Sequence, residues 1–377
     1  MKIACISASN IPSGTANSIQ AMKACQALAQ LGHTVRLLAP GTPGQAEWQA
    51  LAQHYGLRTP FEVSWLMADP RWKRYDFSLV AVRQAAEWGA QVVYTWALQA
   101  ALLGLVADRT RPVLLEMHGP AEGRLGPWLL RLLMRLKGVR RLLPITRALS
   151  EILRRQAGRD FAPGECVLAP NGVDLERFRD LPSPVEARRM LGLPSGLTAG
   201  YTGHLYAGRG IGLLEKLAQR FPQVNFLWVG GLPDDVDAWR KRLEAQGLQN
   251  VTLVGFVKNY RLPLYQAAAD VLLMPYERSI AGSSGGNSAA YASPMKMFEY
   301  MACRRAILSS DLPVVREVIG EQNAVLCPPD DLPAWSQALR GLLAEESLRQ
   351  HLAEQAWQDV QQYTWEARAR RSLEGLA

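Results

Sequence analysis

The sequence is poor in the residues that build metal centres and disulfide frameworks. Its 377 residues include five cysteines and five histidines. The cysteines are scattered without a CxxC pattern and no HExxH pair occurs, so a zinc enzyme and a disulfide-stapled fold are both disfavoured. An odd, dispersed set of thiols indicates a reduced, cytoplasmic protein.

Long apolar runs are also missing. No run reaches the roughly 20 residues that a membrane-spanning helix needs, and the opening MKIACIS lacks the charged-then-apolar pattern of a signal peptide. Acidic residues are outnumbered, 34 against 42 basic ones, which gives a net charge of +8. This excess indicates an anionic partner such as phosphate groups or an acidic membrane surface. Nucleic acid is disfavoured as a partner, because the basic residues are dispersed without interleaved aromatic residues.

Short apolar strands alternate with helical patterns along almost the whole chain. This pattern predicts parallel sheets covered by helices on both faces, and the break near residues 180–196 predicts two doubly wound α/β domains. We expect the first domain at residues 1–182 and the second at residues 183–359. The predicted strands are 2–7, 34–38, 91–96, 112–117 and 140–145 in the first domain and 197–203, 224–231, 250–256, 270–275 and 305–310 in the second.

Ligands of such sheets bind beyond the carboxyl ends of the strands, so the residues that follow each strand are the candidates for a site. In the first domain, Gly14 lies in the turn ASNIPSGTANS before a helix predicted over 17–32, and His118 follows the strand 112–117. No segment has the GxGxxG fingerprint, which disfavours a nicotinamide-dependent dehydrogenase. A plain turn and a structural histidine remain the simpler alternatives.

In the second domain, YTGHLYAGRGIGLL (201–214) predicts a strand, a glycine-rich loop and a helix. Gly203 ends the strand, His204 lies in the loop, and Arg209 directly precedes the helix. A guanidinium and a helix dipole at this point could hold the same phosphate, although a solvated loop arginine is the alternative. Another strand ends in Gly255-Phe256-Val257, where backbone groups could pair with a flat base; an ordinary turn is equally compatible.

The segment SPMKMFEYMA (293–302) predicts a short helix, with Ser293 as its N-cap and Pro294 at the first helical position. The free N–H groups from Ser293 through Met295 to Lys296 could receive a diphosphate, to which Lys296 adds a positive charge. Glu299, one turn farther on, could accept hydrogen bonds from a ribose. The alternative is an exposed Lys296–Glu299 pair. The preceding Gly/Ser-rich segment 280–293 is expected to be a mobile loop.

Together these segments resemble the GT-B glycosyltransferases, and in particular the retaining group 1, family 4 branch that includes glycogen synthases and phosphatidylinositol mannosyltransferases. APNGVDLERF (169–178) is similar to the interdomain PNGVD segment of that branch. GHLYAGRGIGLL (203–214) is similar to its GRxxxxKGxxxL pattern, and SPMKMFEYMA to the second half of its E-x7-E motif. The resemblance covers essentially the whole chain.

This resemblance implies two Rossmann-like domains facing across a cleft. The first would bind the acceptor and the second the donor, with residues 360–377 returning as a helix to the first domain. By position, Glu299 would bind the donor ribose and Arg209 the diphosphate, Gly14 would match the first-domain glycine loop, and His118 would lie near the transferred sugar. The implied reaction is the retaining transfer of a sugar from a nucleotide diphosphate-sugar to a hydroxyl of a glycan, lipid-linked sugar or glycolipid, without a metal or other cofactor.

The chain departs from the family pattern at three positions. Tyr291 stands in place of the first motif glutamate, His204 in place of the arginine of the GR pair, and Arg304 in place of a glycine that follows the motif helix. These departures leave two alternatives open: a nucleotide-sugar epimerase and a non-catalytic scaffold on the same fold.

Two further segments concern metals and membranes. PDDVDAW (233–239) contains a DxD pair at Asp235 and Asp237, but acidic residues are favoured in a first helical turn without any metal. We therefore expect Arg209, Lys296 and two helix N-termini to stabilise the leaving diphosphate. GPWLLRLLMRLKGVRRLLP (126–144) has the pattern of a basic amphipathic helix, which predicts peripheral binding to the anionic inner face of the cell membrane. The alternative is an ordinary helix that covers the first sheet.

Overall fold

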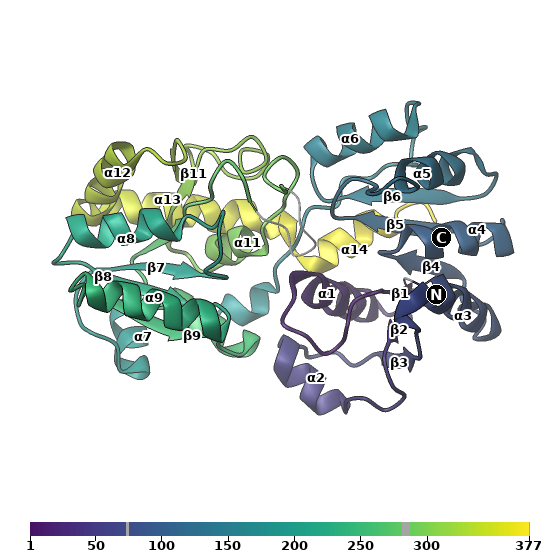
Figure 1. Ribbon diagram of the computed structural model, residues 1–377, viewed down its shortest axis with the longest axis horizontal. Coiled ribbons are helices and arrows are strands. Elements are labelled where there is room, and N and C mark those ends of the chain that lie inside the picture. The colour runs from purple at the N-terminus through teal and green to yellow at the C-terminus, as the bar shows by residue number, and fades with distance from the viewer. Residues whose placement is uncertain (73–74, 281–286, 377) are drawn as a thin grey trace. The chain divides into compact units, whose positions relative to one another are not determined.

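The structure is a computed structural model that describes residues 1–72, 75–280 and 287–376 (Figure 1). The chain forms two compact units. Unit 1 comprises Met1–Asn171 and Trp365–Ala377, and unit 2 comprises Gly172–Thr364. Within the described ranges, no helix has the length and apolar character needed to cross a bilayer.

Unit 1 is built on a six-stranded sheet with the order β3-β2-β1-β4-β5-β6, and each neighbouring pair is parallel. Strands β1, β4, β5 and β6 are buried along their length apart from end residues, as expected for a sheet covered on both faces. Sequence patterning missed β3, because its residues alternate polar and apolar. The strands are β1 (Lys2–Ile6), β2 (Thr34–Pro40), β3 (Glu62–Leu66), β4 (Val92–Thr95), β5 (Val113–Met117) and β6 (Arg140–Pro144).

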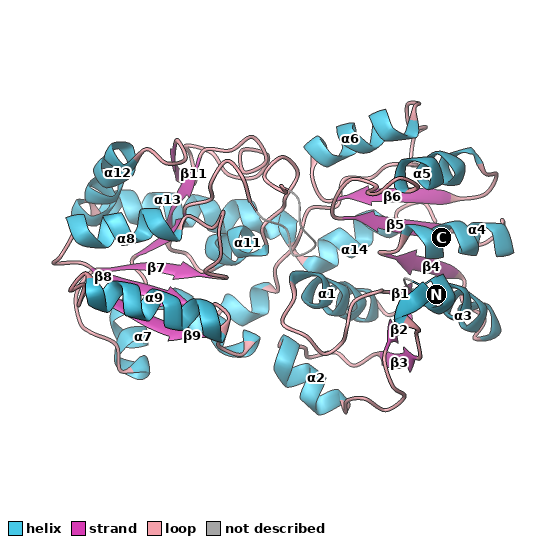
Figure 2. Ribbon diagram, in the orientation of Figure 1, coloured by secondary structure: helices cyan, strands magenta, loops and turns pink. Residues whose placement is uncertain are grey.

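The helices of unit 1 connect these strands, and the last of them comes from the end of the chain (Figure 2). Thr15 caps the first helix, two residues before the predicted helix 17–32, because its side chain accepts a hydrogen bond from the Ser18 N–H. The helices are α1 (Ala16–Gln30), α2 (Trp48–Tyr55), α3 (Tyr75–Glu87), α4 (Leu98–Ala107), α5 (Gly126–Arg135), α6 (Arg147–Ala157) and α14 (Trp365–Leu373).

The basic segment 126–144 is not one helix. Helix α5 ends at Arg135 and strand β6 begins at Arg140. Arg140 donates hydrogen bonds to the carbonyls of Leu136 and Met134, and the buried Arg141 donates to the Ser372 carbonyl. The predicted strand at 140–145 is therefore confirmed, and the second half of the basic segment belongs to the sheet, where its arginines satisfy backbone oxygens.

Unit 2 repeats the architecture with a six-stranded sheet in the order β12-β11-β10-β7-β8-β9, again parallel throughout. Each predicted strand is present, and the three-residue β12 was missed. The strands are β7 (Thr198–Thr202), β8 (Asn225–Val229), β9 (Val251–Gly255), β10 (Val271–Met274), β11 (Ala306–Ser310) and β12 (Val325–Cys327).

Helices pack on the sheet of unit 2 around a core that includes the buried Trp228 and Trp335. These helices are α7 (Pro184–Leu191), α8 (Ile211–Arg220), α9 (Pro233–Ala245), α10 (Leu262–Ala267), α11 (Met295–Ala302), α12 (Leu332–Ala344) and α13 (Glu346–Val360). Short 3-10 turns at Pro70–Trp72, Leu175–Phe178, Asn259–Arg261 and Gln361–Tyr363 complete the described secondary structure. Because all strands of a unit run in one direction, their carboxyl ends lie at one edge of each sheet.

Candidate functional site

Glycines allow three strand ends of unit 2 to approach one another closely. A Cβ atom on Gly230, whose φ is +118°, would lie 2.2 Å from the carbonyl oxygen of Gly203. The Gly230 N–H donates to the Gly255 carbonyl at 2.7 Å, and the Gly203 N–H donates to Val229 at 2.8 Å. The predicted site residues Gly203 and Gly255, which end β7 and β9, are thereby held at one edge of the sheet.

The loop after β7 packs closely against the residues that follow β10. Gly210 precedes α8 with a φ of +73°, and a Cβ atom there would lie 1.6 Å from the Pro275 carbonyl oxygen. Only glycine fits this contact. It places the neighbouring Arg209 beside Tyr276, with the guanidinium carbon 5.4 Å from the ring centroid.

Arg209, Lys296 and His204 form what we call the cation cluster. The Arg209 Nη2 atom donates to the Tyr206 hydroxyl at 2.6 Å, and its guanidinium lies 4.9 Å from the same ring. Burial opposes the charge, but Tyr276 and Tyr206 favour it, so the pKa of Arg209 lies above its ordinary value. Arg209 is therefore a permanent, desolvated cation.

Lys296 lies in the first turn of α11 and points back toward β7. Its Nζ atom is 4.0 Å from the Tyr201 ring centroid and 5.3 Å from that of Tyr276. A Cβ atom on Gly203 would lie 2.6 Å from this Nζ, so the lysine approaches the glycine backbone directly. Among the described residues the buried Nζ has no hydrogen-bond partner. Burial and then Arg209 hold the pKa of Lys296 well below its usual range.

His204 completes the cation cluster. Its ring stacks on Tyr206 with centroids 5.0 Å apart, and its buried Nδ1 has no hydrogen-bond partner in the described part of the chain. Burial, followed by the charges of Arg209 and Lys296, lowers the pKa of His204. The imidazole is thus neutral near pH 7 until a negative charge arrives.

These three side chains have the chemistry that an anion site requires. Leaving buried donors unpaired costs about 1–3 kcal/mol per group, and more for a charged one. A multiply charged anion would remove this cost by accepting hydrogen bonds from the Lys296 ammonium and the Arg209 Nε, which also lacks a partner in the described ranges. The free N–H groups at the start of α11 add to the attraction.

Glu299 is held in place by the side chain of Gln266. Its Oε2 accepts a hydrogen bond from the Gln266 amide at 3.0 Å, and that amide also reaches the Thr202 hydroxyl at 3.3 Å. The half-buried carboxylate is therefore held in the protein interior next to β7. The alternative of an exposed Lys296–Glu299 ion pair is wrong, because the Lys296 ammonium packs on Tyr201 instead.

The start of α11 differs by one position from the prediction. The helix begins at Met295 with Pro294 as its N-cap, and no side chain provides a capping hydrogen bond. Ser293 therefore precedes the cap and is buried. Of the predicted loop 280–293, residues 281–286 lie outside the described residues.

The remaining predicted residues of unit 2 lie at the end of β9 and around α9. Phe256 is 63% exposed, directly after Gly255 with its φ of +80°, and Val257 is half-buried. Asp235 lies in the first turn of α9, as expected for a helix start, and Asp237 pairs with Arg240 at 2.6 Å.

Arg304, which stands where the resemblance places a glycine, has a backbone conformation that favours glycine. Its φ is +52°, in the left-handed region. The guanidinium lies 4.1 Å from the Trp357 ring, and this stacking offsets part of the strain.

The two candidates of the first domain lie in unit 1. Gly14 is exposed in the turn between β1 and α1. His118 follows β5, with its Nε2 atom 2.5 Å from the Glu116 Oε1 and its Nδ1 3.4 Å from the Asn17 Oδ1. Sequence reasoning missed Glu116, although its place inside an otherwise apolar strand was a signal that it has buried partners.

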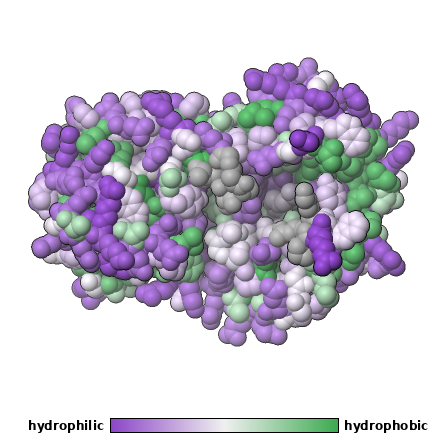
Figure 3. Space-filling model, in the orientation of Figure 1, coloured by the Kyte–Doolittle hydropathy of each residue, from purple (hydrophilic) through white to green (hydrophobic). Residues whose placement is uncertain are grey.

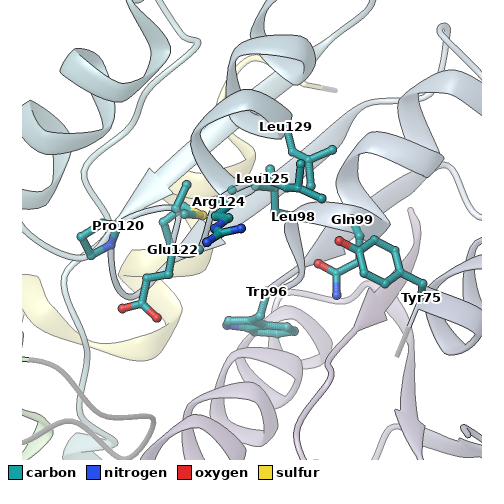
Figure 4. A pocket seen from close by; sticks show the side chains of 13 residues that line it. Tyr75, Trp96, Leu98, Gln99, Pro120, Glu122, Arg124, Leu125 and Leu129 are labelled. Atoms are coloured by element: carbon teal, nitrogen blue, oxygen red, sulfur yellow. The ribbon is translucent and has the colours of Figure 1, made fainter. Parts of the chain in front are cut away.

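A cavity of about 540 Å³ lies in unit 1. Trp96, which follows β4, and Arg124, which precedes α5, frame it together with leucines from α4 and α5 (Figure 4). Met117 and Pro120, which flank His118–Gly119 in the sequence, also line it. The lining therefore mixes aromatic and aliphatic side chains with polar and charged ones, which can bind a polar small molecule.

Two family models cover most of the chain. The model described as Glycosyltransferase Family 4 matches residues 18–177, and the one described as Glycosyl transferases group 1 matches residues 198–345. The chain is 25% identical to a phosphatidyl-myo-inositol mannosyltransferase of Mycolicibacterium smegmatis, over 94% of this chain and 88% of that protein. It is 28% identical to a D-inositol 3-phosphate glycosyltransferase of Xylanimonas cellulosilytica, over 63% and 56% of the two chains.

Solved structures share the fold. A sucrose-phosphate synthase of Thermosynechococcus elongatus superposes with a TM-score of 0.74 at 22% identity, over 98% of this chain and 96% of that one. The Anabaena protein HepE, in complex with UDP, has a TM-score of 0.74 at 19% identity, over 100% and 99%. The expectation of two Rossmann-like domains is confirmed, and the glycosyltransferase models disfavour the epimerase and scaffold alternatives.

Proposed function

Because this chain is a glycosyltransferase, of the group 1 and family 4 type with the GT-B fold, we propose that it transfers a sugar from a nucleotide diphosphate-sugar to an acceptor hydroxyl with retention of anomeric configuration. The observation that supports this most directly is the cation cluster of unit 2, whose buried donors lack partners within the described ranges. UDP is the ligand named for the similarly folded Anabaena protein, and it is the first probe to use.

In this proposal the diphosphate binds to Arg209, Lys296 and His204 and to the N–H groups that open α11. Glu299, held by Gln266 at 3.0 Å, accepts hydrogen bonds from the ribose hydroxyls. The base lies against the backbone of Gly255 and Val257, and the exposed Phe256 ring covers it. Each contact uses a residue at the carboxyl edge of the unit 2 sheet, where ligands of open α/β sheets bind.

The chemical step depends on stabilising charge. Departure of the nucleoside diphosphate leaves an oxocarbenium-like sugar, and preorganised cations at the leaving group supply the largest stabilising term. Arg209 and Lys296 can provide that charge, so the proposal requires no metal ion. The departing phosphate oxygen takes the proton of the acceptor hydroxyl on the same face of the sugar, which retains the anomeric configuration.

The acceptor belongs to unit 1. We assign it to the cavity that Trp96 and Arg124 frame, whose aromatic and aliphatic side chains suit a sugar ring or the apolar part of a lipid-linked acceptor. Trp96 supplies a face on which a sugar ring can stack. His118 would then lie near the transferred sugar, and Gly14 would leave the β1–α1 turn open to the substrate.

The surface of α5 favours peripheral binding at the inner face of the membrane. Leu125 and Trp128 are 62% and 57% exposed, and the exposed Arg124, Arg131 and Lys137 lie nearby in the sequence. Hydrophilic side chains otherwise dominate the visible face, with apolar ones in separate patches (Figure 3). We expect the protein to sediment together with anionic phosphatidylglycerol vesicles but not with phosphatidylcholine vesicles. Trp128→Ser should weaken it, and equal sedimentation with both vesicles would contradict an electrostatic contribution.

A binding experiment tests the donor site. We expect UDP or another nucleoside diphosphate to raise the melting temperature of the wild-type protein, and Arg209→Met and Glu299→Ala each to abolish this shift. Lys241→Met, which changes an exposed lysine of α9, is the matched control and should keep it. If both site variants bind nucleotide normally, the donor site has been misassigned.

Turnover tests the reaction itself. With the donor that binds, proton NMR of the product should show the anomeric configuration of the donor, and EDTA should leave the rate unchanged. An inverted product would contradict the retaining mechanism, and loss of activity in EDTA would contradict the metal-free one.

A further inference from the structure

A carboxylate is buried in the middle of unit 1. Glu116 is 1% exposed within strand β5. Its Oε2 accepts a hydrogen bond from the Tyr94 hydroxyl at 2.5 Å, and its Oε1 lies 2.6 Å from the Arg368 Nη2 and 2.5 Å from the His118 Nε2. A buried charge with this many partners is held in one position.

The carboxylate is ionised under all ordinary conditions. Burial alone would raise the pKa of Glu116, but Arg368, His118 and Tyr94 together lower it to about 2. An ionised carboxylate can only accept hydrogen bonds. The nitrogen of His118 that faces it must therefore carry a proton.

Arg368 gives the carboxylate its fixed counter-charge. This residue lies on α14, is 2% exposed, and donates from Nε to the Pro170 carbonyl at 3.0 Å and from Nη1 to the Tyr94 hydroxyl at 3.1 Å. The guanidinium is thus held by the backbone that precedes unit 2 and by strand β4. Its position does not depend on His118.

We propose that Glu116 is a positioning residue that holds His118 in the tautomer with the proton on Nε2, so that the Nδ1 lone pair is presented to a hydroxyl of the sugar substrate. Arg368 and Tyr94 fix Glu116 for this purpose. The inference rests on the proposed transferase function, in which His118 lies near the transferred sugar. Among the described residues Nδ1 lies 3.4 Å from the Asn17 Oδ1, a long contact that a substrate hydroxyl can replace.

Direct observation of the tautomer tests this inference without any turnover. The chain has five histidines, so nitrogen-15 labelling of histidine gives few signals, and a His118→Gln variant identifies those of His118. At pH 8 we expect the Nε2–H pattern for His118 in the wild-type protein. An Nδ1–H pattern, or averaging of the two tautomers, would overturn the proposal even if the protein transfers sugar efficiently.

Three variants separate positioning from simple packing. Glu116→Met should let the tautomers interconvert and reduce kcat by about 100-fold, as expected when a reacting group loses its orientation, while KM for the donor stays near the wild-type value. Glu116→Gln keeps an acceptor oxygen of similar geometry, so it should keep the Nε2–H pattern and a kcat well above that of Glu116→Met. Glu165→Met, the matched control, removes another ion-paired carboxylate of unit 1, which contacts Arg140 and Arg159, and should leave both the tautomer and kcat unchanged.

The outcomes separate the proposed transferase function from the positioning role of Glu116. If the wild-type protein shows the Nε2–H pattern but no sugar transfer, the proposed function is wrong and the positioning of His118 stands only as a structural fact. If transfer occurs but Glu116→Met retains wild-type kcat and the Nε2–H pattern, the positioning role is wrong. Should Glu116→Met fail to fold, the tautomer of His118 in the wild-type protein and in Glu116→Gln still decides the question.

Discussion

Replacement of Lys296 by methionine should stabilise the protein while abolishing donor binding. The Lys296 ammonium is buried and has no hydrogen-bond partner among the residues described. Burying an ion costs several kcal/mol after relaxation. The Tyr201 ring at 4.0 Å returns about 2 kcal/mol of this cost, and the more distant Tyr276 less. Methionine has a similar volume and no charge to bury.

The expected gain is about 1–3 kcal/mol in the free energy of unfolding, the surplus of the burial cost over the ring contacts. For a unit of this size each kcal/mol raises Tm by roughly 2–4 °C, so thermal unfolding should shift upward by roughly 2–10 °C. The wild-type protein should gain about 2.7 kcal/mol from UDP at 100 times its Kd. The variant should gain nothing, because the charge that meets the diphosphate is gone.

The assay is thermal unfolding with and without UDP, with Lys241→Met as the matched exposed control. A lower Tm for Lys296→Met would refute the reasoning, because it would mean that Tyr201 and Tyr276 fully compensate the lysine in the free protein. A UDP-induced shift that survives the substitution would refute the placement of the diphosphate at this ammonium.

Three further predictions follow from described contacts. Gly210→Ala should destabilise unit 2 by at least about 2 kcal/mol and weaken UDP binding, because the new Cβ would lie 1.6 Å from the Pro275 carbonyl oxygen. Urea unfolding measures the loss, and an unchanged unfolding midpoint would contradict this prediction. Because the folded pKa of Glu116, about 2, lies below its ordinary value of 4.5, about 3 kcal/mol of stability should be fully present above pH 4.5 and disappear as the pH falls toward 2. Urea titrations from pH 6 to 2.5 should show this slope in the wild-type protein and lose it in Glu116→Gln. UDP binding should take up protons near pH 7, since the anion raises the lowered pKa of His204. Calorimetry in buffers of different ionisation enthalpy measures the uptake, and proton release would contradict it.

The strands that carry the site could be predicted because parallel strands buried on both faces are continuous apolar runs. Strand β3 and the three-residue β12 could not, because their patterns are alternating or too short. The helix at Met295 was found from its start signal, but Ser293 does not cap it, since the chain reaches the helix through Pro294 in an extended conformation. Local sequence can place a helix start to within a residue, and only tertiary contacts decide the cap.

Arg209, Lys296 and His204 were predicted from the sequence as site residues, but their contacts and their lowered or raised pKa values were not. That Lys296 points back onto Tyr201, rather than outward toward Glu299, depends on the glycine backbone at Gly203, which leaves room for the ammonium. The partnership of Glu116 and Arg368 joins residues more than 200 positions apart, whose contact no local pattern could reveal. Long-range pairs of this kind cannot be predicted from the pattern of a single sequence.

Helix α14 gives unit 1 a particular order of assembly. The ribosome releases the chain from its N-terminus, so the first 171 residues of unit 1 emerge, and then all of unit 2, before Arg368 becomes available. Until that moment the Glu116 carboxylate has no guanidinium, and strand β5 has an uncompensated acid at its centre. The first part of unit 1 must therefore wait for helix α14 before it can close its interior.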